Sequence, residues 1–288
     1  MPNPATEALL APPLPKAAKP IAVAPSDGRR PLRITAISWF AVAATGQVFF
    51  VAYLLLLYGR AALHGDWSAL NKVMPKGYVP GDVLGNLTIA LHILLAIAIT
   101  LGGLVQLVPQ IRARAPAFHR WNGRVYMACV AATCVAGLYM VWIRGSGPGD
   151  FSQHLGITLD AVLVLWCMGM ALRHALARQI AAHRRWALRL FMVANGVWFF
   201  RVGFMFWVLL NRGPAGFDPE TFTGPFLTIL SFADTLLPLA VLEIYLRAKE
   251  QGRASRRIAV AALLGVLTVA MAVGIFGATV GLWLPNVH

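Results

Sequence analysis

The sequence predicts an all-α integral membrane protein with about seven transmembrane helices. Of its 288 residues, 58% are hydrophobic and only 12% are charged, whereas a soluble domain carries about 25% charged residues. Apolar stretches long enough to cross a bilayer recur along the whole chain. Basic residues gather in alternate connections between these stretches, which is typical of membrane topology signals. Together these observations exclude soluble architectures.

The formal net charge of +14 does not indicate a nucleic-acid partner. The Lys and Arg residues lie in short segments between apolar runs, where they set topology and favour anionic lipid headgroups. The expected partners are therefore membrane lipids. The three cysteines lie inside apolar runs, so no disulfide framework is expected.

The first 31 residues are rich in Pro and Ala, which predicts a disordered cytoplasmic tail before a membrane domain over residues 32–288. Residues 32–82 are expected to form a first helix and an outer loop. A duplicated four-helix core (83–210) and two C-terminal helices (211–288) follow. The apolar runs, each near the ~20 residues that a bilayer needs, are 34–58, 83–108, 122–143, 155–177, 188–210, 223–246 and 258–283. In the outer loop, residues 59–82 suit a plain connection better than a lid or an interfacial helix.

The positions of the basic residues predict the orientation of the chain. Arg clusters precede the first run and follow the second, fourth and sixth runs, whereas the other connections are richer in Gly, Pro and Asp. Positive-inside counting places the N-terminus in the cytoplasm and the C-terminus in the periplasm or outside the cell. The expected location is the bacterial inner (plasma) membrane.

The second and third apolar runs share a pattern with the fourth and fifth. In the first pair His92 is followed by "HRWNGR", which contains His119, Arg120 and Arg124. In the second pair His154 is followed by "HRRWALR", which contains His183, Arg184 and Arg189. The repeat predicts a central four-helix bundle made of two repeated hairpins, related by an axis along the membrane normal.

Histidines on facing helices are one way in which a bundle ligates haem iron. The repeat predicts an inner pair, His119 with His183, and an outer pair, His92 with His154. His92 lies roughly 14 Å below the outer end of its helix at 1.5 Å per residue, deeper than His154. Arginines at the inner edge are placed to bind haem propionates; they are Arg120, Arg124, Arg184, Arg185 and Arg189.

Each of these residues also has a purely structural interpretation. His119 and His183 stand beside Arg and Trp, as interfacial anchors do. His154 borders a Gly-rich connection, where a histidine is usually solvated. His92 differs, because a histidine well inside an apolar helix is costly and indicates a function.

Three further ionisable residues lie inside apolar runs. Arg201 is about nine residues from the outer end of the fifth run, and Asp160 and Asp234 reach a similar depth in the fourth and sixth runs. Because an intramembrane Arg is rarely unpaired, we expect a buried ion pair of Arg201 with Asp234 or Asp160. Such a pair either locks helices together or takes part in proton transfer or anion binding.

The segment from "LHILLAIAITLGGLVQLVPQ" to "HRRWALRLFMVANGVWFFR" resembles the bacterial membrane family catalogued as domain of unknown function 2306. The resemblance covers about half the chain and implies a multi-helix membrane protein, without an activity. The matching positions are His92, Gln106, Pro109, His119, Arg120, Gly123, Arg124, Tyr126, His183, Arg184, Trp186, Arg189 and Arg201. At the level of architecture, the chain is similar to two-haem transmembrane cytochromes b, which place ligating histidines on four consecutive helices. It departs from them in having its inner histidines at helix starts.

The leading hypothesis is a transmembrane electron-transfer protein that binds b-type haem and accepts electrons from a quinol or a small reductant. The alternative is a non-redox transporter or lipid-handling protein, in which the inner His-Arg-Trp clusters bind an anionic group and the Arg–Asp pair gates or relays protons. A third hypothesis is a structural or assembly subunit. No motif of a di-iron, zinc-protease, serine-hydrolase or phosphate-loop enzyme is found in the sequence. Whether the protein is an enzyme stays open.

Overall fold

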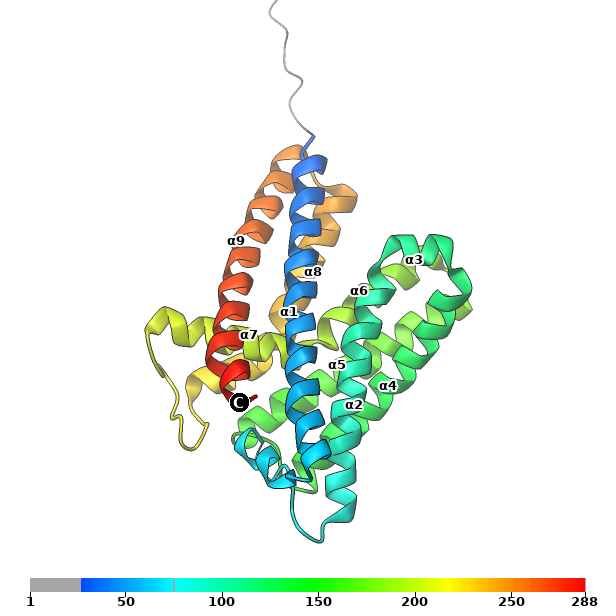
Figure 1. Cartoon of the computed structure of the whole chain (residues 1–288). Coiled ribbons are helices and arrows are strands. Elements are labelled where there is room, and N and C mark those ends of the chain that lie inside the picture. Colours follow the sequence, from blue (N-terminus) through cyan, green and yellow to red (C-terminus); the bar gives the residue numbers. More distant parts are fainter. Residues whose placement is uncertain (1–26, 75, 288) are drawn as a thin grey trace, which may run out of the picture.

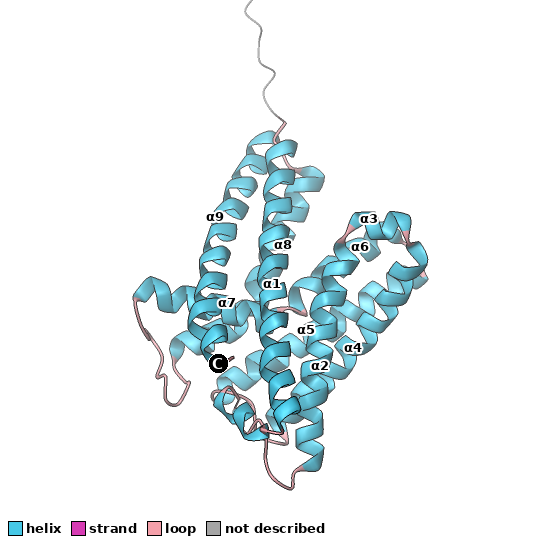
Figure 2. Ribbon diagram, in the orientation of Figure 1, coloured by secondary structure: helices cyan, strands magenta, loops and turns pink. Residues whose placement is uncertain are grey.

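The structure, a computed structural model, describes residues 27–74 and 76–287. In these residues all regular secondary structure is helical and no β-strand forms (Figures 1 and 2). This confirms an all-α fold. The helices are α1 (Arg29–His64), α2 (Val83–Leu107), α3 (Pro109–Arg114), α4 (Pro116–Trp142), α5 (Phe151–Leu176), α6 (Ile180–Val193), α7 (Gly196–Asn211), α8 (Pro225–Gln251) and α9 (Ala254–Ala278).

The structure bears on two segments for which the sequence makes predictions, the N-terminal tail and the connection over residues 59–82. The predicted tail lies largely outside the described residues, but its last three residues, 29–31, already belong to α1. Gly28 precedes α1 with a φ of 70°, and an added Cβ there would lie 2.8 Å from the carbonyl oxygen of Ala254. This close approach places the starts of α1 and α9 side by side. The connection 59–82 contains the end of α1 and a 3₁₀ segment, Trp67–Lys72.

Within the described ranges, six helices are long and apolar enough to cross a membrane, and α6 with α7 form a seventh span if the bent pair is counted as one. The predicted fifth run is therefore not one straight helix, because α6 and α7 meet at an angle of 51°. Asn195 lies at the break, where its side-chain amide donates to the carbonyl of Phe191 (2.7 Å) and its oxygen accepts from the Gln47 amide (3.0 Å). A side chain that inserts into the backbone ladder is a known cause of helix kinks.

The alternate basic connections meet at one end of the molecule. Figure 1 shows the start of α1, the α2–α3–α4 connection and the α8–α9 connection at the same end. Since α4 and α5 are neighbouring antiparallel helices, the α5–α6 connection belongs to this end too. We call it the basic end. The topology thus agrees with the predicted alternation, whereas the assignment of this end to the cytoplasm stays a prediction.

Helices α2, α4, α5 and α6 form a four-helix bundle. In the ring, α2 packs on α4, α4 on α5 and α5 on α6. Phe191 of α6 closes the ring of helices, because its side chain lies 3.3 Å from the position that a Cβ would take on Gly103 of α2. The shared interior is formed by Ile99, Tyr126, Val130, Val164, Cys167, Leu190 and Val193. As a result, α2 lies diagonally opposite α5, and α4 lies diagonally opposite α6.

The remaining helices form a second layer in which α1 packs on α9 and α9 on α7. Glycine allows two very close contacts between helices. A Cβ on Gly274 of α9 would overlap the carbonyl oxygen of Val202 on α7, and one on Gly156 of α5 would lie 2.5 Å from that of Ser231 on α8. The second contact joins the bundle to α8.

An ion pair fixes the end opposite the basic end. Asp82 accepts a hydrogen bond from the backbone N–H of Gly85 (2.9 Å) and so caps α2. The Arg144 guanidinium, just after α4, donates to Asp82 (2.8 Å) and to the Asn86 side chain (2.9 Å). Arg144 therefore joins the start of α2 to the end of α4.

We predict that Gly156→Ala lowers the free energy of unfolding by about 1–3 kcal/mol, because the new methyl group meets a backbone carbonyl that cannot turn away. Gly169→Ala on the same helix is the matched control, since nothing lies within 4 Å of the position that a Cβ would take there. At that position the substitution should be neutral or slightly stabilising. Thermal unfolding in detergent measures both variants, and an equal effect at the two positions would contradict the close contact.

The Asp82–Arg144 pair predicts a pH dependence. The Arg144 guanidinium, followed by the Gly85 N–H, lowers the pKa of Asp82 below its usual 3.8. Stabilisation by this pair is thus complete above the unfolded pKa and is lost as the pH falls through the lower folded pKa. Arg144→Gln should be less stable than wild type at neutral pH, and the difference should shrink on acidification to about pH 3. A gap in melting temperature that stays constant would refute this.

Candidate functional site

The inner histidine pair lies at the basic end of the four-helix bundle. His119 is in the first turn of α4 and His183 is in the first turn of α6. These two helices are diagonal in the bundle, and the two imidazoles are near enough to interact electrostatically. The structure thus places both rings at the basic end of the bundle, and their joint role as ligands stays a prediction.

The Nδ1 atoms of the two rings have different surroundings. The Nδ1 of His183 lies 2.9 Å from the carbonyl oxygen of Ala171. Because a carbonyl only accepts, Nδ1 carries the proton, and in a neutral ring Nε2 keeps its lone pair. The Nδ1 of His119 is buried and has no hydrogen-bond partner among the described residues.

Gln106 and Gly123 position the first turn of α4. The Gln106 amide donates to the carbonyl of His119 (3.0 Å), and a Cβ on Gly123 would lie 2.8 Å from the Gln106 amide nitrogen. Asn122 donates to the carbonyl of Gly102 on α2 (3.1 Å). The Gln, His and Gly of the family-like motif therefore form one contact between α2 and α4.

The arginines at the basic end fall into two groups. Arg120, Arg124 and Arg184 are exposed and form no ion pair within the described parts of the chain. Arg189 donates twice to Glu243 of α8, at 2.6 and 3.0 Å, and lies 4.5 Å from the Trp186 ring centroid. Arg185 contacts Glu250 at 3.3 Å. The sequence predicts that Arg189 binds a haem propionate, but its guanidinium is already paired with the Glu243 carboxylate.

The outer histidines are not brought together. The His92 ring lies at the backbone of Thr133 and near Gly137, where a Cβ would be 3.6 Å away. The His154 ring packs edge-on against Trp142, with ring centroids 5.8 Å apart. Thr133 and Gly137 precede Trp142 on α4 by nine and five residues, so the two rings differ in depth by about 7–14 Å. The structure does not form the predicted outer pair.

Unsatisfied polar atoms are concentrated in this bundle. Of the described side chains with a buried polar atom that has no hydrogen-bond partner, six belong to the bundle helices α2, α4 and α5: His92, Gln106, His119, Tyr126, Thr133 and His154. Others, such as Gln47, Trp198 and Trp283, lie outside the bundle. Each such atom costs about 1–3 kcal/mol. Native proteins rarely leave such atoms unsatisfied, so ordered water or a bound ligand is expected beside them.

The predicted ion pair of Arg201 with Asp160 or Asp234 is not formed: no N···O distance within 4.0 Å joins them in the described structure. Arg201 faces α1 instead, 5.3 Å from the Phe50 ring centroid, and donates to the carbonyl of Val197 (3.1 Å).

The helix geometry explains this difference. Asp160 lies beside Gly196, where a Cβ would be 3.1 Å from its carboxylate, and accepts from Thr235 (2.7 Å). Arg201 follows Gly196 by five residues, which is about 140° around α7 and about 7.5 Å along it. Asp160 therefore faces α8 while Arg201 points to α1. Asp234 interacts electrostatically with Asp160, and its Oδ1 is buried without a partner among the described residues.

Two structural groups have only weak signals in the sequence. Arg144 is the basic residue beside an otherwise Gly- and Pro-rich connection, "RGSGPGD". Gln47 and Asn195, which hold the helix break, are polar residues inside apolar runs. Polar residues at such positions could have been recognised as partners, but their pairing across 148 positions could not.

Residues 89–220 match the family model described as "Predicted membrane protein (DUF2306)". The match contains the four histidines of the repeat and Arg201, and it confirms the resemblance proposed from the sequence. No curated protein and no solved structure matches the chain. The family description assigns a membrane protein and no activity.

We predict that Arg189→Met lowers the free energy of unfolding by about 1–3 kcal/mol, because Glu243 is left partly buried without its double donor. Glu243→Gln alone should cost less, and the double variant should be more stable than the sum of the single changes implies. A double-mutant cycle of thermal unfolding measures this coupling. Arg185→Met is the control, because its pair with Glu250 is nearly half exposed and such pairs contribute little. Additive effects at Arg189 and Glu243 would contradict a coupled pair.

Proposed function

We propose that the four-helix bundle binds b-type haem between His119 and His183 and transfers electrons within the membrane. The observation that carries the proposal is the pair of imidazoles on diagonal helices, of which one has its Nδ1 buried without a partner among the described residues. Two opposed imidazoles are a suitable donor set for a haem iron. The bound group would supply a one-electron carrier with a potential set by its ligands and surroundings.

Three contacts of the described side chains support this role at the inner pair. The carbonyl of Ala171 orients the His183 ring and leaves Nε2 as the ligand atom. Gln106 holds the backbone of His119 and therefore the start of α4. Arg120, Arg124 and Arg184 are the cations available for propionates, since Arg189 is engaged with Glu243.

The proposal is limited to one haem. His92 and His154 lie at different depths, so joint ligation by these two residues requires a rearrangement of the outer end. We therefore assign His92 and His154 no shared iron site. The unpartnered Nδ1 of His92 and Nε2 of His154 are instead places for ordered water.

The proposed setting is the bacterial inner membrane with the basic end in the cytoplasm and the C-terminus in the periplasm or outside. The support is the gathering of the arginine-rich connections at one end, as the positive-inside rule requires. The proposed electron donor is a quinol or a small soluble reductant.

A non-redox transporter is the second candidate, and the helix break favours it. Discontinuous membrane helices often border the binding sites of transporters. Here the break between α6 and α7 lies beside Asp160, which in turn neighbours Asp234. In this interpretation the two carboxyl groups bind a substrate or relay protons, without help from Arg201.

The optical spectrum of the protein purified from haem-replete cells tests the leading proposal. We expect a Soret band and a reduced-minus-oxidised α band in the wild type. His119→Ala and His183→Ala should each abolish the band shift, because one axial nitrogen is lost.

His174→Ala is the matched control, since the His174 ring lies at the same end of the bundle and is hydrogen-bonded to the Gln179 side chain (2.6 Å). Melting curves of the three variants separate loss of ligand from loss of fold. A colourless wild type would overturn the haem proposal, and retention of the full spectrum in both single variants would exclude these ligands. Substrate-dependent loss of function in Asp160→Asn with no pigment would favour transport.

A further inference from the structure

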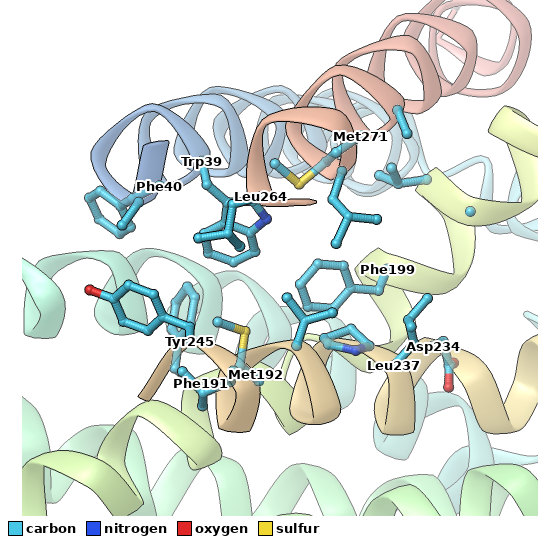
Figure 3. A pocket seen from close by; sticks show the side chains of 18 of the residues that line it. Trp39, Phe40, Phe191, Met192, Phe199, Asp234, Leu237, Tyr245, Leu264 and Met271 are labelled. Atoms are coloured by element: carbon cyan, nitrogen blue, oxygen red, sulfur yellow. The ribbon is translucent and has the colours of Figure 1, made fainter. Parts of the chain in front are cut away.

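A second candidate site lies outside the four-helix bundle. A groove of about 440 Å³ opens between α1, α6, α7, α8 and α9. In Figure 3, Trp39, Leu264 and Met271 face Met192 and Tyr245 across it. None of the described histidines lines this groove. It is therefore separate from the proposed haem site.

The groove is long and almost entirely apolar along its walls. Its two charged lining residues are Asp234 and Lys249, both on α8. They are separated by fifteen residues, which is about 22 Å along a helix. Lys249 is exposed at the basic end, 5.7 Å from the Tyr245 ring centroid, whereas Asp234 lies farther along α8, one turn beyond Leu237 (Figure 3). The shape suits a molecule with one polar head and a long apolar chain.

Asp234 is the polar side chain at the end of the groove away from Lys249, and one of its oxygens lacks a hydrogen-bond donor in the described structure. Its Oδ1 is buried and has no hydrogen-bond partner among the described residues. The adjacent Thr235 interacts with the Asp234 carboxylate but donates its hydroxyl hydrogen bond to Asp160 (2.7 Å). Within the described chain no Lys, Arg or His nitrogen approaches either carboxylate within 4.0 Å. A ligand that donates a hydrogen bond would supply the missing partner.

The side chains that line the groove decide which kind of ligand head group can donate a hydrogen bond to Asp234. Phe199 and Trp39 both line the groove, with ring centroids 6.4 Å apart. These rings favour a flat aromatic head. An ammonium head would also donate, but burying a charged group among apolar side chains costs far more than burying a hydroxyl.

We propose that this groove binds one lipophilic phenol, whose hydroxyl donates to Asp234 and whose chain follows α8 toward Lys249. A membrane quinol belongs to this chemical class. Its role as electron donor rests on the proposed haem function, whereas its binding does not. The link between the sites is α6, which carries His183 at its start and lines the groove with Phe191 and Met192.

Calorimetric titration of the full chain in lipid nanodiscs tests the proposal, with empty nanodiscs subtracted. The probes are a decyl-substituted hydroquinone and its dimethyl ether, which has the same ring and chain but no donor. We expect the ether to bind about tenfold more weakly, as the loss of one buried hydrogen bond implies. Asp234→Leu should weaken the hydroquinone about tenfold and leave the ether unchanged. This variant removes an unpartnered oxygen, so folding should be preserved.

A second variant pair tests the location. Ala270 lines the groove, whereas Ala272 on the same helix is exposed. Ala270→Trp should block both probes, and Ala272→Trp should bind both as the wild type does. Equal binding of the two probes, or an Asp234→Leu variant with unchanged affinity, would show that the groove only holds lipid chains and would overturn the proposal.

Two further outcomes separate this proposal from its neighbours. Tighter, Asp234-dependent binding of tetraphenylphosphonium would make this a site for lipophilic cations and would also overturn it. Hydroquinone binding that persists in His183→Ala, without any haem spectrum, would support the phenol site even if the haem proposal fails. Absence of hydroquinone binding in a protein with a normal haem spectrum would reject the phenol site alone.

Discussion

The bend between α6 and α7 joins the two layers of this protein, and the buried hydrogen bond from Gln47 to Asn195 holds it (3.0 Å). Before the bend, α6 completes the four-helix bundle. After it, α7 leaves the bundle and packs on α9. A straight helix of the same length would extend the bundle and leave α9 without this neighbour. In an apolar environment a satisfied polar pair is hard to separate, so this contact sets the relation between the layers.

Because of this bend, α6 contributes to two environments. Leu190 and Val193 belong to the bundle interior, whereas Met192 lines the groove beside α8. The same short helix starts with His183 at the basic end. A change that alters the angle of α6 is therefore expected to affect the histidine pair and the groove together.

The charged groups divide by depth. Some of those near the two ends of the molecule form ion pairs, as Asp82 does with Arg144 and Arg189 with Glu243. In the middle, Arg201, Asp160 and Asp234 form no ion pair with one another in the described structure. Arg201 lies against the aromatic ring of Phe50 instead. Buried groups without an opposite charge are costly in a membrane, and they are usually retained for function.

Much of the site was predictable from local patterns. The repeated "HRW" and "HRRW" motifs placed His119 and His183 at the same end, because basic flanks and apolar run lengths determine depth in a bilayer. The outer histidine pair and the Arg201–Asp pair could not be predicted in this way. Similar depth in the membrane does not determine the direction in which a side chain points around its helix. A rotation of about 100° per residue decides which neighbour a side chain meets.

The sequence by itself determined the membrane class, the helical fold, the alternation of the basic connections and the repeat of the histidines. These properties follow from hydrophobicity and charge along the chain, which act residue by residue. Only the tertiary structure decided that α4 and α6 are diagonal, that α6 ends at a break and that Asp234 lies in an apolar groove. These features depend on contacts such as Gly156 with Ser231 and Gln47 with Asn195, which join residues distant in the chain. Such pairings come from the packing of whole helices, and no single segment contains them.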